Sequence, residues 1–210
     1  MADWVTISSL ATAGGTLVLA VATFSSVRSA NRAARAAERS LLVGLRPVLI
    51  PSREDDPVER VMFGEGHRVT LHGHGAVLEL ADGHLYMAMG LRNAGQGLAV
   101  LHGWRVEVSQ PGPAERPDLD EFRRQLRDLY IPAGDYGFWQ GAIRDPSDPS
   151  FEPLEGAIDT GERVTIDLLY GDHEGGQRTI ARFGVTLNEE GNARSANVIR
   201  YWNVDRPDPR

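Results

Sequence analysis

The chain has 210 residues, no cysteine, and a formal net charge of −7 at pH 7. This length allows one ordinary globular domain with an appendage. Without cysteine, structural disulfides and thiolate metal sites are excluded, so any metal would need His and carboxylate ligands. Residues 28–46 carry a local charge of +4, whereas residues 47–210 carry −10. An acidic body without a basic stripe argues against a nucleic-acid partner.

The first predicted element is a transmembrane helix over residues 4–27, which contain no charged side chain. At 1.5 Å per residue this stretch forms a helix of about 36 Å, enough to cross a hydrocarbon core of roughly 30 Å. Its many Ser and Thr residues make it only mildly apolar. Gly14 and Gly15 permit close helix approach, so the span serves either as a simple anchor or as a surface for helix association.

Basic residues follow the span and an acid, Asp3, precedes it. A secretory signal peptide has the opposite order, so we expect the segment to remain as an anchor. The positive-inside rule then places the N-terminus outside and the rest of the chain in the cytoplasm, as a single-pass protein of the plasma membrane.

The next segment, residues 28–43, is rich in alanine and is predicted to continue the helix. Its arginines recur at spacings of four, three and four, which places them on one helix face. They are Arg28, Arg32, Arg35 and Arg39. The stripe either lies against anionic headgroups or is a solvated face with a role in topology only. We therefore divide the chain into a helical part, 1–45, and a soluble domain, 46–210.

Alternating apolar residues and glycine-rich turns predict strands through most of the soluble domain. The candidate strands are 47–50, 60–63, 68–71, 76–80, 84–93, 98–109, 137–143, 163–170, 178–187 and 198–204. We expect hairpins between 163–170 and 178–187, and between 84–93 and 98–109. Apolar residues at helical spacing predict a short helix within 118–130. The fold class is thus mainly β, an immunoglobulin-like antiparallel β-sandwich with one short inserted helix.

The motif whose residue types best suit catalysis or metal binding is Asp172-His173-Glu174, followed by Gln177 and Arg178. A histidine between two carboxylates suits a general base or a metal ligand. The alternative is a polar hairpin tip whose aspartate and glycines make the turn.

A second histidine motif, His72-Gly73-His74, would put both imidazoles on one face if the segment is a strand, as half of a zinc site. The third ligand could be any of the other histidines. Histidines flanked by glycine are also common in ordinary loops, so both interpretations stay open.

The segment GFWQGA, residues 137–142, places two aromatic residues next to each other on a strand. Neighbouring strand residues point to opposite faces, so one of Phe138 and Trp139 faces the core and the other faces out. We take Trp139, Gln177 and Arg178 as the candidate surface for a partner.

Several stretches of the chain resemble a family of uncharacterised actinobacterial proteins with an N-terminal transmembrane helix and an immunoglobulin-like β-sandwich. The stretches are RP (46–47), LRNAGQGLA (91–99), RDLYIP (127–132), GFWQGA (137–142), YGDHEGG (170–176) and YWNVDRP (201–207). The resemblance covers nearly the whole chain. It implies the architecture and no activity.

Common enzyme signatures are missing from the sequence, including a phosphate-binding loop and a nucleophile elbow. The leading hypothesis is a non-catalytic module, without a cofactor, that binds a protein partner, a second copy or a small ligand at the cytoplasmic membrane face. One alternative is a membrane-tethered metal-dependent hydrolase using His173 with Asp172 or Glu174. Another is a structural subunit of a membrane complex.

Overall fold

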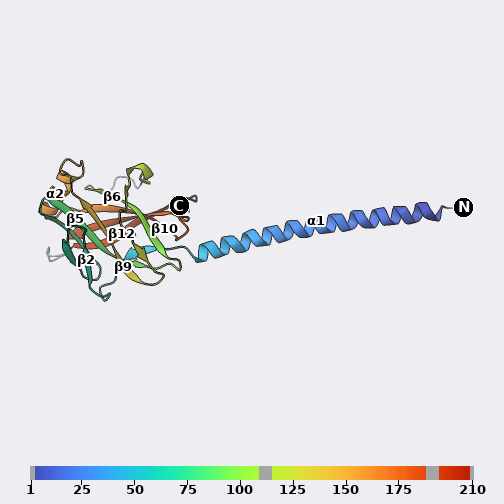
Figure 1. Cartoon of the computed structure of the whole chain (residues 1–210), viewed down its shortest axis with the longest axis horizontal. Coiled ribbons are helices and arrows are strands. Elements are labelled where there is room, and N and C mark those ends of the chain that lie inside the picture. Colours follow the sequence, from blue (N-terminus) through green and yellow to red (C-terminus); the bar gives the residue numbers. More distant parts are fainter. Residues whose placement is uncertain (1–2, 109–114, 188–193, 209–210) are drawn as a thin grey trace. The chain divides into compact units, whose positions relative to one another are not determined.

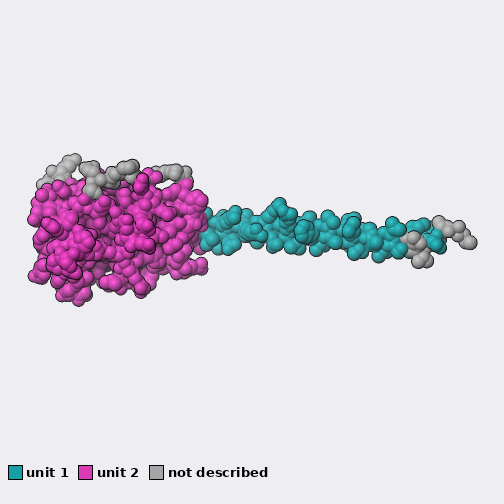
Figure 2. Space-filling view, turned by 90° about the horizontal axis from the view of Figure 1, so that it is seen from above, with its two compact units in different colours: residues 1–44 teal, residues 45–210 magenta. Residues whose placement is uncertain are grey.

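The computed structural model describes residues 3–108, 115–187 and 194–208, and only the backbone of residues 5 and 6. The chain divides into two compact units, Met1–Gly44 and Leu45–Arg210. Figure 2 colours these two units separately.

The first unit is one continuous helix, α1 (Trp4–Gly44). It is long and apolar enough to cross a membrane, and the side chains in its apolar window are exposed. Thr12 and Thr16 each donate a hydroxyl hydrogen bond of 2.9 Å to the carbonyl four residues earlier. Hydroxyls bonded within their own helix add little cost to insertion in lipid. The predicted helix over residues 4–43 is confirmed.

The second unit is built mainly of antiparallel strands (Figure 1). Every predicted strand segment contains a strand, and two further short strands, β7 and β8, occur where none was expected. The strands are β1 (Leu49–Pro51), β2 (Glu59–Met62), β3 (Arg68–Leu71), β4 (Gly75–Ala81), β5 (His84–Asn93), β6 (Ala99–Glu107), β7 (Arg123–Arg124), β8 (Tyr130–Ile131), β9 (Tyr136–Ile143), β10 (Val164–Gly171), β11 (Thr179–Leu187) and β12 (Arg194–Asn203).

The strands form two layers around one main core, as a β-sandwich requires. In one layer β5 lies between β9 on one side and β4 and β1 on the other. The second layer runs β12-β11-β10-β6, with β7 and β8 along the outer edge of β6. A short β4–β12 pairing joins the layers at one end. On β10 the predicted inward residues Val164, Ile166 and Leu168 are fully buried in the core.

The hairpin predicted between β10 and β11 is confirmed, since Val164 pairs with Val185 and Tyr170 with Thr179. The hairpin predicted between β5 and β6 is wrong. β5 pairs with β1, β4 and β9, whereas β6 pairs with β10, β7 and β8. The short loop after Asn93 therefore crosses from one layer to the other instead of returning beside its own strand.

The side chain of Asn93, which is completely buried, explains why the chain crosses here. Its Oδ1 accepts the backbone N–H groups of Val48 at 3.1 Å and Gly95 at 3.0 Å. Its Nδ2 donates to the carbonyls of Gly97 at 2.6 Å and Ile131 at 3.0 Å. A Cβ at Gly95 or Gly97 would collide with the backbone of residues 45–48, so glycine lets the loop pass close to the domain entry.

The short helix lies at a different place from the one predicted. Within 118–130 there is only a 3₁₀ turn, Leu119–Glu121, because Arg123 and Arg124 pair with β6 and Leu126 is 89% exposed. The helix is α2 (Phe151–Thr160), whose buried residues are Phe151, Leu154 and Ala157. Pro153 lies in the first turn of α2, where no backbone N–H is needed for a helix hydrogen bond. Because proline usually indicates the absence of a helix, the sequence did not predict one here.

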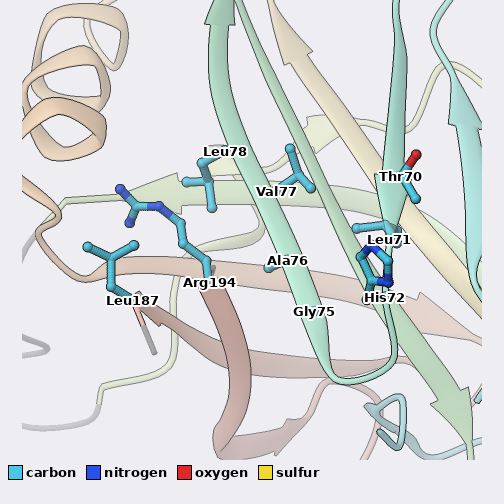
Figure 3. A pocket seen from close by; sticks show the side chains of 9 residues that line it. All are labelled: Thr70, Leu71, His72, Gly75, Ala76, Val77, Leu78, Leu187 and Arg194. Carbon is cyan, nitrogen blue, oxygen red and sulfur yellow. The ribbon is translucent and has the colours of Figure 1, made fainter. Parts of the chain in front are cut away.

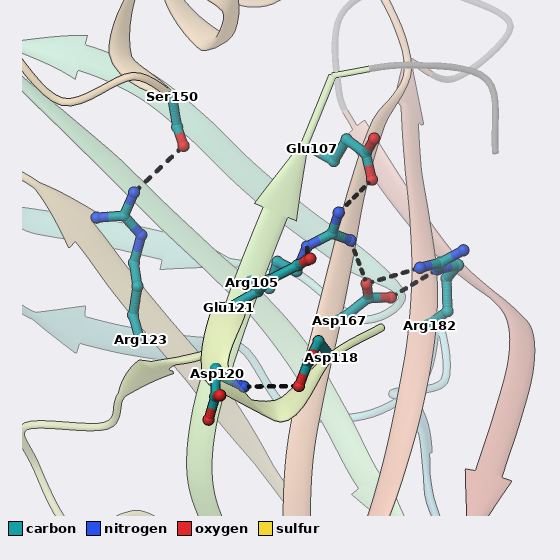
Figure 4. Close-up of polar contacts among 9 residues, drawn as sticks. All are labelled: Arg105, Glu107, Asp118, Asp120, Glu121, Arg123, Ser150, Asp167 and Arg182. Atoms are coloured by element: carbon teal, nitrogen blue, oxygen red, sulfur yellow. Dashed lines mark hydrogen bonds and ion pairs between the residues drawn. The ribbon is translucent and has the colours of Figure 1, made fainter. Parts of the chain in front are cut away.

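A buried ion cluster covers part of the outer face of the second layer (Figure 4). Asp167 of β10 is only 1% exposed. Arg182 donates to its two oxygens at 2.7 and 2.9 Å, and Arg105 donates at 3.0 Å. Arg105 also pairs with Glu107 and Glu121. A buried carboxylate needs such partners, so this cluster is part of the framework of the fold.

We expect Asn93→Ala to lower the free energy of unfolding by about 3 kcal/mol, because it leaves several buried backbone groups without partners. Urea denaturation of the full-length chain in detergent, followed by near-ultraviolet circular dichroism, measures this. Asn197→Ala, at an exposed position of β12, is the matched control and should change stability by less than about 0.5 kcal/mol. Equal effects from the two variants would contradict the role given to Asn93.

Candidate functional site

The Asp172-His173-Glu174 motif forms the loop between β10 and β11. Asp172 is buried, and its Oδ1 accepts the N–H groups of Glu174 at 3.1 Å and Gly176 at 2.8 Å. Its Oδ2 accepts from Gln177 at 3.3 Å. His173 and Glu174 are exposed. The Asp172 carboxylate therefore holds the turn, as the hairpin-tip interpretation expects.

His72 and His74 would share a face only in a strand, and neither lies in one. Both lie in the turn between β3 and β4, and His74 has a φ of 60°. The His74 N–H donates to the Ser52 hydroxyl at 3.0 Å. Among the residues that the structure describes, no three or more His, Asp or Glu side chains are grouped so that they could hold a metal ion.

The candidate partner surface is also corrected by the structure. Trp139 is completely buried in the main core, where its ring meets Trp104 edge-on with the centroids 5.6 Å apart. Its neighbour Phe138 faces the other way and is half-buried. Arg178 makes a bidentate ion pair with Asp205, at 2.7 and 3.1 Å, and Gln177 accepts from Arg206 at 3.2 Å. These two residues hold the C-terminal segment.

The four arginines of the α1 stripe are exposed, in agreement with their predicted place on a helix surface. Within the described residues they contact no acidic side chain of their own helix closely enough to form an ion pair.

One pocket of the domain, with a volume of about 340 Å³, lies beside β4 (Figure 3). Its charged wall residue, Arg194, donates to the carbonyls of Ala157, Ile158 and Glu162 at 3.1 to 3.2 Å. A cation there stabilises the C-terminal end of α2. Arg194 is thus committed to the fold.

A second pocket, of about 280 Å³, carries a much higher density of positive charge. We call it the edge pocket, because it lies where the edge strand β9 of one layer approaches β6 and β7 of the other. It is lined by Phe63, Trp104, Arg123, Arg124, Gln125, Leu126, Arg127, Gln140, Gly141, Ala142 and Arg144.

Two of the four pocket arginines are held by acids. Arg123 donates to both Asp148 oxygens at 2.5 and 2.7 Å, and Arg144 pairs with Glu65. Arg124 and Arg127 are exposed, and the guanidinium group of neither has a hydrogen bond or ion pair with any residue in the described ranges. In a domain of net negative charge, these two guanidinium groups are available to an anion.

The apolar wall of the edge pocket depends on Gly141. A Cβ at this position would lie 2.7 Å from Trp139 Cζ2 and 3.1 Å from Trp104 Cε2, so only glycine lets the two indoles meet beneath the strand. The Arg123 guanidinium lies 5.3 Å above the centre of the Trp104 ring, a cation–π contact that keeps both groups in place.

The polar wall contains two amide oxygens without donors. Gln125 donates its Nε2 to the Gln140 carbonyl at 3.2 Å, but the Oε1 atoms of both side chains are buried and unpartnered among the described residues. Gln140 is only 9% exposed. Buried polar atoms are usually satisfied, so unpartnered ones are typical of sites that bind a ligand or water.

Sequence reasoning missed the edge pocket because its residues come from four separate segments. The arginine pair at 123–124 was assigned to a helix, and Gln140 was considered only as a neighbour of Trp139. The one local signal was the density of arginine between residues 123 and 127.

We expect Asp148→Asn to reduce stability at pH 7 by about 1 kcal/mol, because it removes the partner of Arg123. The hydrogen bond from Arg123 holds the pKa of Asp148 below its ordinary value. The stabilisation is therefore complete above the pKa of an unfolded Asp, near 3.9, and is lost as pH falls through the lower folded pKa.

Urea denaturation across about pH 2 to 7 measures this effect, and the variant should lose less stability than the wild type over the acid part of that range. Asp128→Asn, which changes an exposed carboxylate between β7 and β8, is the control. An identical acid dependence in wild type and Asp148→Asn would show that the pair does not stabilise the fold.

Comparison with known proteins gives little similarity. No protein-family model matches the chain, and no curated protein matches it. Among solved structures, the chain is similar to a protein from Archaeoglobus fulgidus, with 10% sequence identity and a TM-score of 0.24. The similarity covers 71% of this chain and 96% of that one.

Proposed function

We propose that the protein is a membrane-anchored, non-catalytic module whose β-sandwich binds a ligand in the edge pocket. The observation that carries this proposal is the pair of free guanidinium groups, Arg124 and Arg127, on the wall of a pocket in an otherwise acidic domain. The anchor gives the place of action and the pocket gives the binding site.

The anchor is supported by the length and exposure of α1. A surface helix of a soluble protein has an apolar stripe on one face only, whereas the successive residues Leu17, Val18 and Leu19 of this span point to different sides of the helix and are each 68% exposed. Such a segment is stable when lipid covers it on all sides. We take residues 4–27 as the membrane-spanning part.

The orientation follows from charge. Arg28, Arg32, Arg35 and Arg39 come directly after the span and Asp3 comes before it. Arginines near the end of a span remain on the cytoplasmic side, which supports a cytoplasmic location for the β-sandwich. The stripe is also suited to anionic headgroups, at about 1 kcal/mol for each charge near the surface.

Binding without catalysis is supported by how the carboxylates are used. Asp172 holds its own turn. His67 contacts Glu79 at 2.5 Å and stacks on the buried ring of Tyr86, with the centroids 4.1 Å apart. This contact fixes the small β2–β3 hairpin against the first layer. These two polar clusters therefore have a role in the fold, whereas the guanidinium groups of Arg124 and Arg127 have no partner among the described residues.

For orientation, we expect protease to digest the β-sandwich in inside-out vesicles and to leave it intact in whole spheroplasts. An epitope placed at the C-terminus, detected by immunoblot, reports the result. Digestion in spheroplasts with protection in inside-out vesicles would reverse the proposed topology.

For the anchor, the double substitution Val18→Asp and Leu19→Asp should move the protein from the membrane to the soluble fraction. Two acids at the centre of a span cost roughly 5–7 kcal/mol of insertion free energy. Alkaline carbonate extraction measures the distribution. The control, Val18→Leu with Leu19→Val, should stay in the membrane, and retention of the acidic variant there would contradict the proposal.

A further inference from the structure

We infer that the ligand of the edge pocket is a small aromatic anion, in which one flat apolar ring carries a phosphate or a carboxylate. This inference rests on the proposed function, since it names the chemical class bound at the same site. It follows from the charge, the apolar wall and the volume of the pocket.

The charge of the pocket requires an anion. Of its four arginines, Arg123 and Arg144 are neutralised by Asp148 and Glu65, whereas Arg124 and Arg127 have no acidic partner in the described ranges. Guanidinium groups bind carboxylate and phosphate oxygens through paired N–H donors. A cationic ligand would be repelled, and a neutral one would leave these donors unused.

The apolar wall requires more than a bare inorganic ion. Phe63 comes from the β2–β3 hairpin and Trp104 from β6, and both line the pocket, together with Ala142 and Gly141, which has no side chain. The Arg123 guanidinium lies over the Trp104 ring, which holds this wall in place. Such a surface favours a planar apolar group through burial and ring contacts.

The polar wall and the volume set the size of the ligand. A cavity of about 280 Å³ is at the lower end of the range for small-molecule sites, so it suits one ring with its anionic group. The unpartnered amide oxygens of Gln125 and Gln140 lie beside it. A small rotation of either side chain would offer an acceptor to a hydroxyl or N–H group on the ring.

Isothermal titration calorimetry of the full-length protein in a non-ionic detergent tests this inference with three probes. Phenyl phosphate has the ring and the charge, inorganic phosphate has only the charge, and benzyl alcohol has only the ring. We expect phenyl phosphate to bind with a dissociation constant of about 1 mM or tighter, and each of the other two to bind at least about tenfold more weakly.

The double variant Arg124→Gln with Arg127→Gln should weaken phenyl phosphate binding by at least about tenfold, because both free guanidinium groups are removed. The matched control is Arg60→Gln with Arg68→Gln. It removes two exposed arginines of the β2–β3 hairpin that line none of the pockets described here, and it makes the same change in net charge. The control should bind phenyl phosphate as the wild type does.

The filling variant Ala142→Phe separates failure of this inference from failure of the proposed function. If Ala142→Phe loses binding while benzyl alcohol and phenyl phosphate bind the wild type equally, the pocket is a binding site but its ligand needs no negative charge. If inorganic phosphate and phenyl phosphate bind equally, the ligand needs no aromatic ring. Either result would overturn the aromatic anion and keep the proposed function. Binding of no probe, or binding unchanged in both pocket variants, would overturn the inference and leave the pocket without a function.

Discussion

The buried amide of Asn93 is the interaction on which the arrangement of the β-sandwich depends. Its four hydrogen bonds join the end of β5, the crossing loop, the chain before β1 and the end of β8. A buried amide that lost these partners would cost several kcal/mol, so the four segments are fixed together. Leu49 adds to the same junction, because Tyr201 donates to its carbonyl at 2.7 Å and its N–H donates to Tyr170 at 3.3 Å.

Arginine supplies most of the polar framework outside this junction. Arg105 and Arg182 hold Asp167 on the outer face of the second layer, and Arg194 stabilises the end of α2. The planar guanidinium makes several directed bonds at once, which a lysine at the same place could not do. Arg124 and Arg127 have no such partner among the described residues, and unlike Arg60 and Arg68, which also have none, they line the edge pocket.

The two units of the chain differ in how their polar groups are satisfied. In α1 the backbone bonds within the helix and the hydroxyls of Thr12 and Thr16 bond back to it, so the segment needs no partner in lipid. In the β-sandwich, polar groups are satisfied by residues distant in sequence, as for Arg46, which bonds to Thr179 and Asn203. A helix of this kind can be predicted from a short stretch of sequence, whereas the strand pairing of a β-sandwich cannot.

The sequence by itself determined the helical segment, all strands except β7 and β8, and the turn of the β10–β11 hairpin, because hydrophobic periodicity and turn chemistry are local. It did not determine that β5 and β6 belong to different layers, since strand pairing depends on contacts such as those of Asn93. The edge pocket could not be predicted from the sequence for the same reason. Its lining residues, such as Phe63, Trp104 and Gln140, are brought together only by the tertiary fold. Local patterns decide which residues form an element, and long-range burial decides which elements meet.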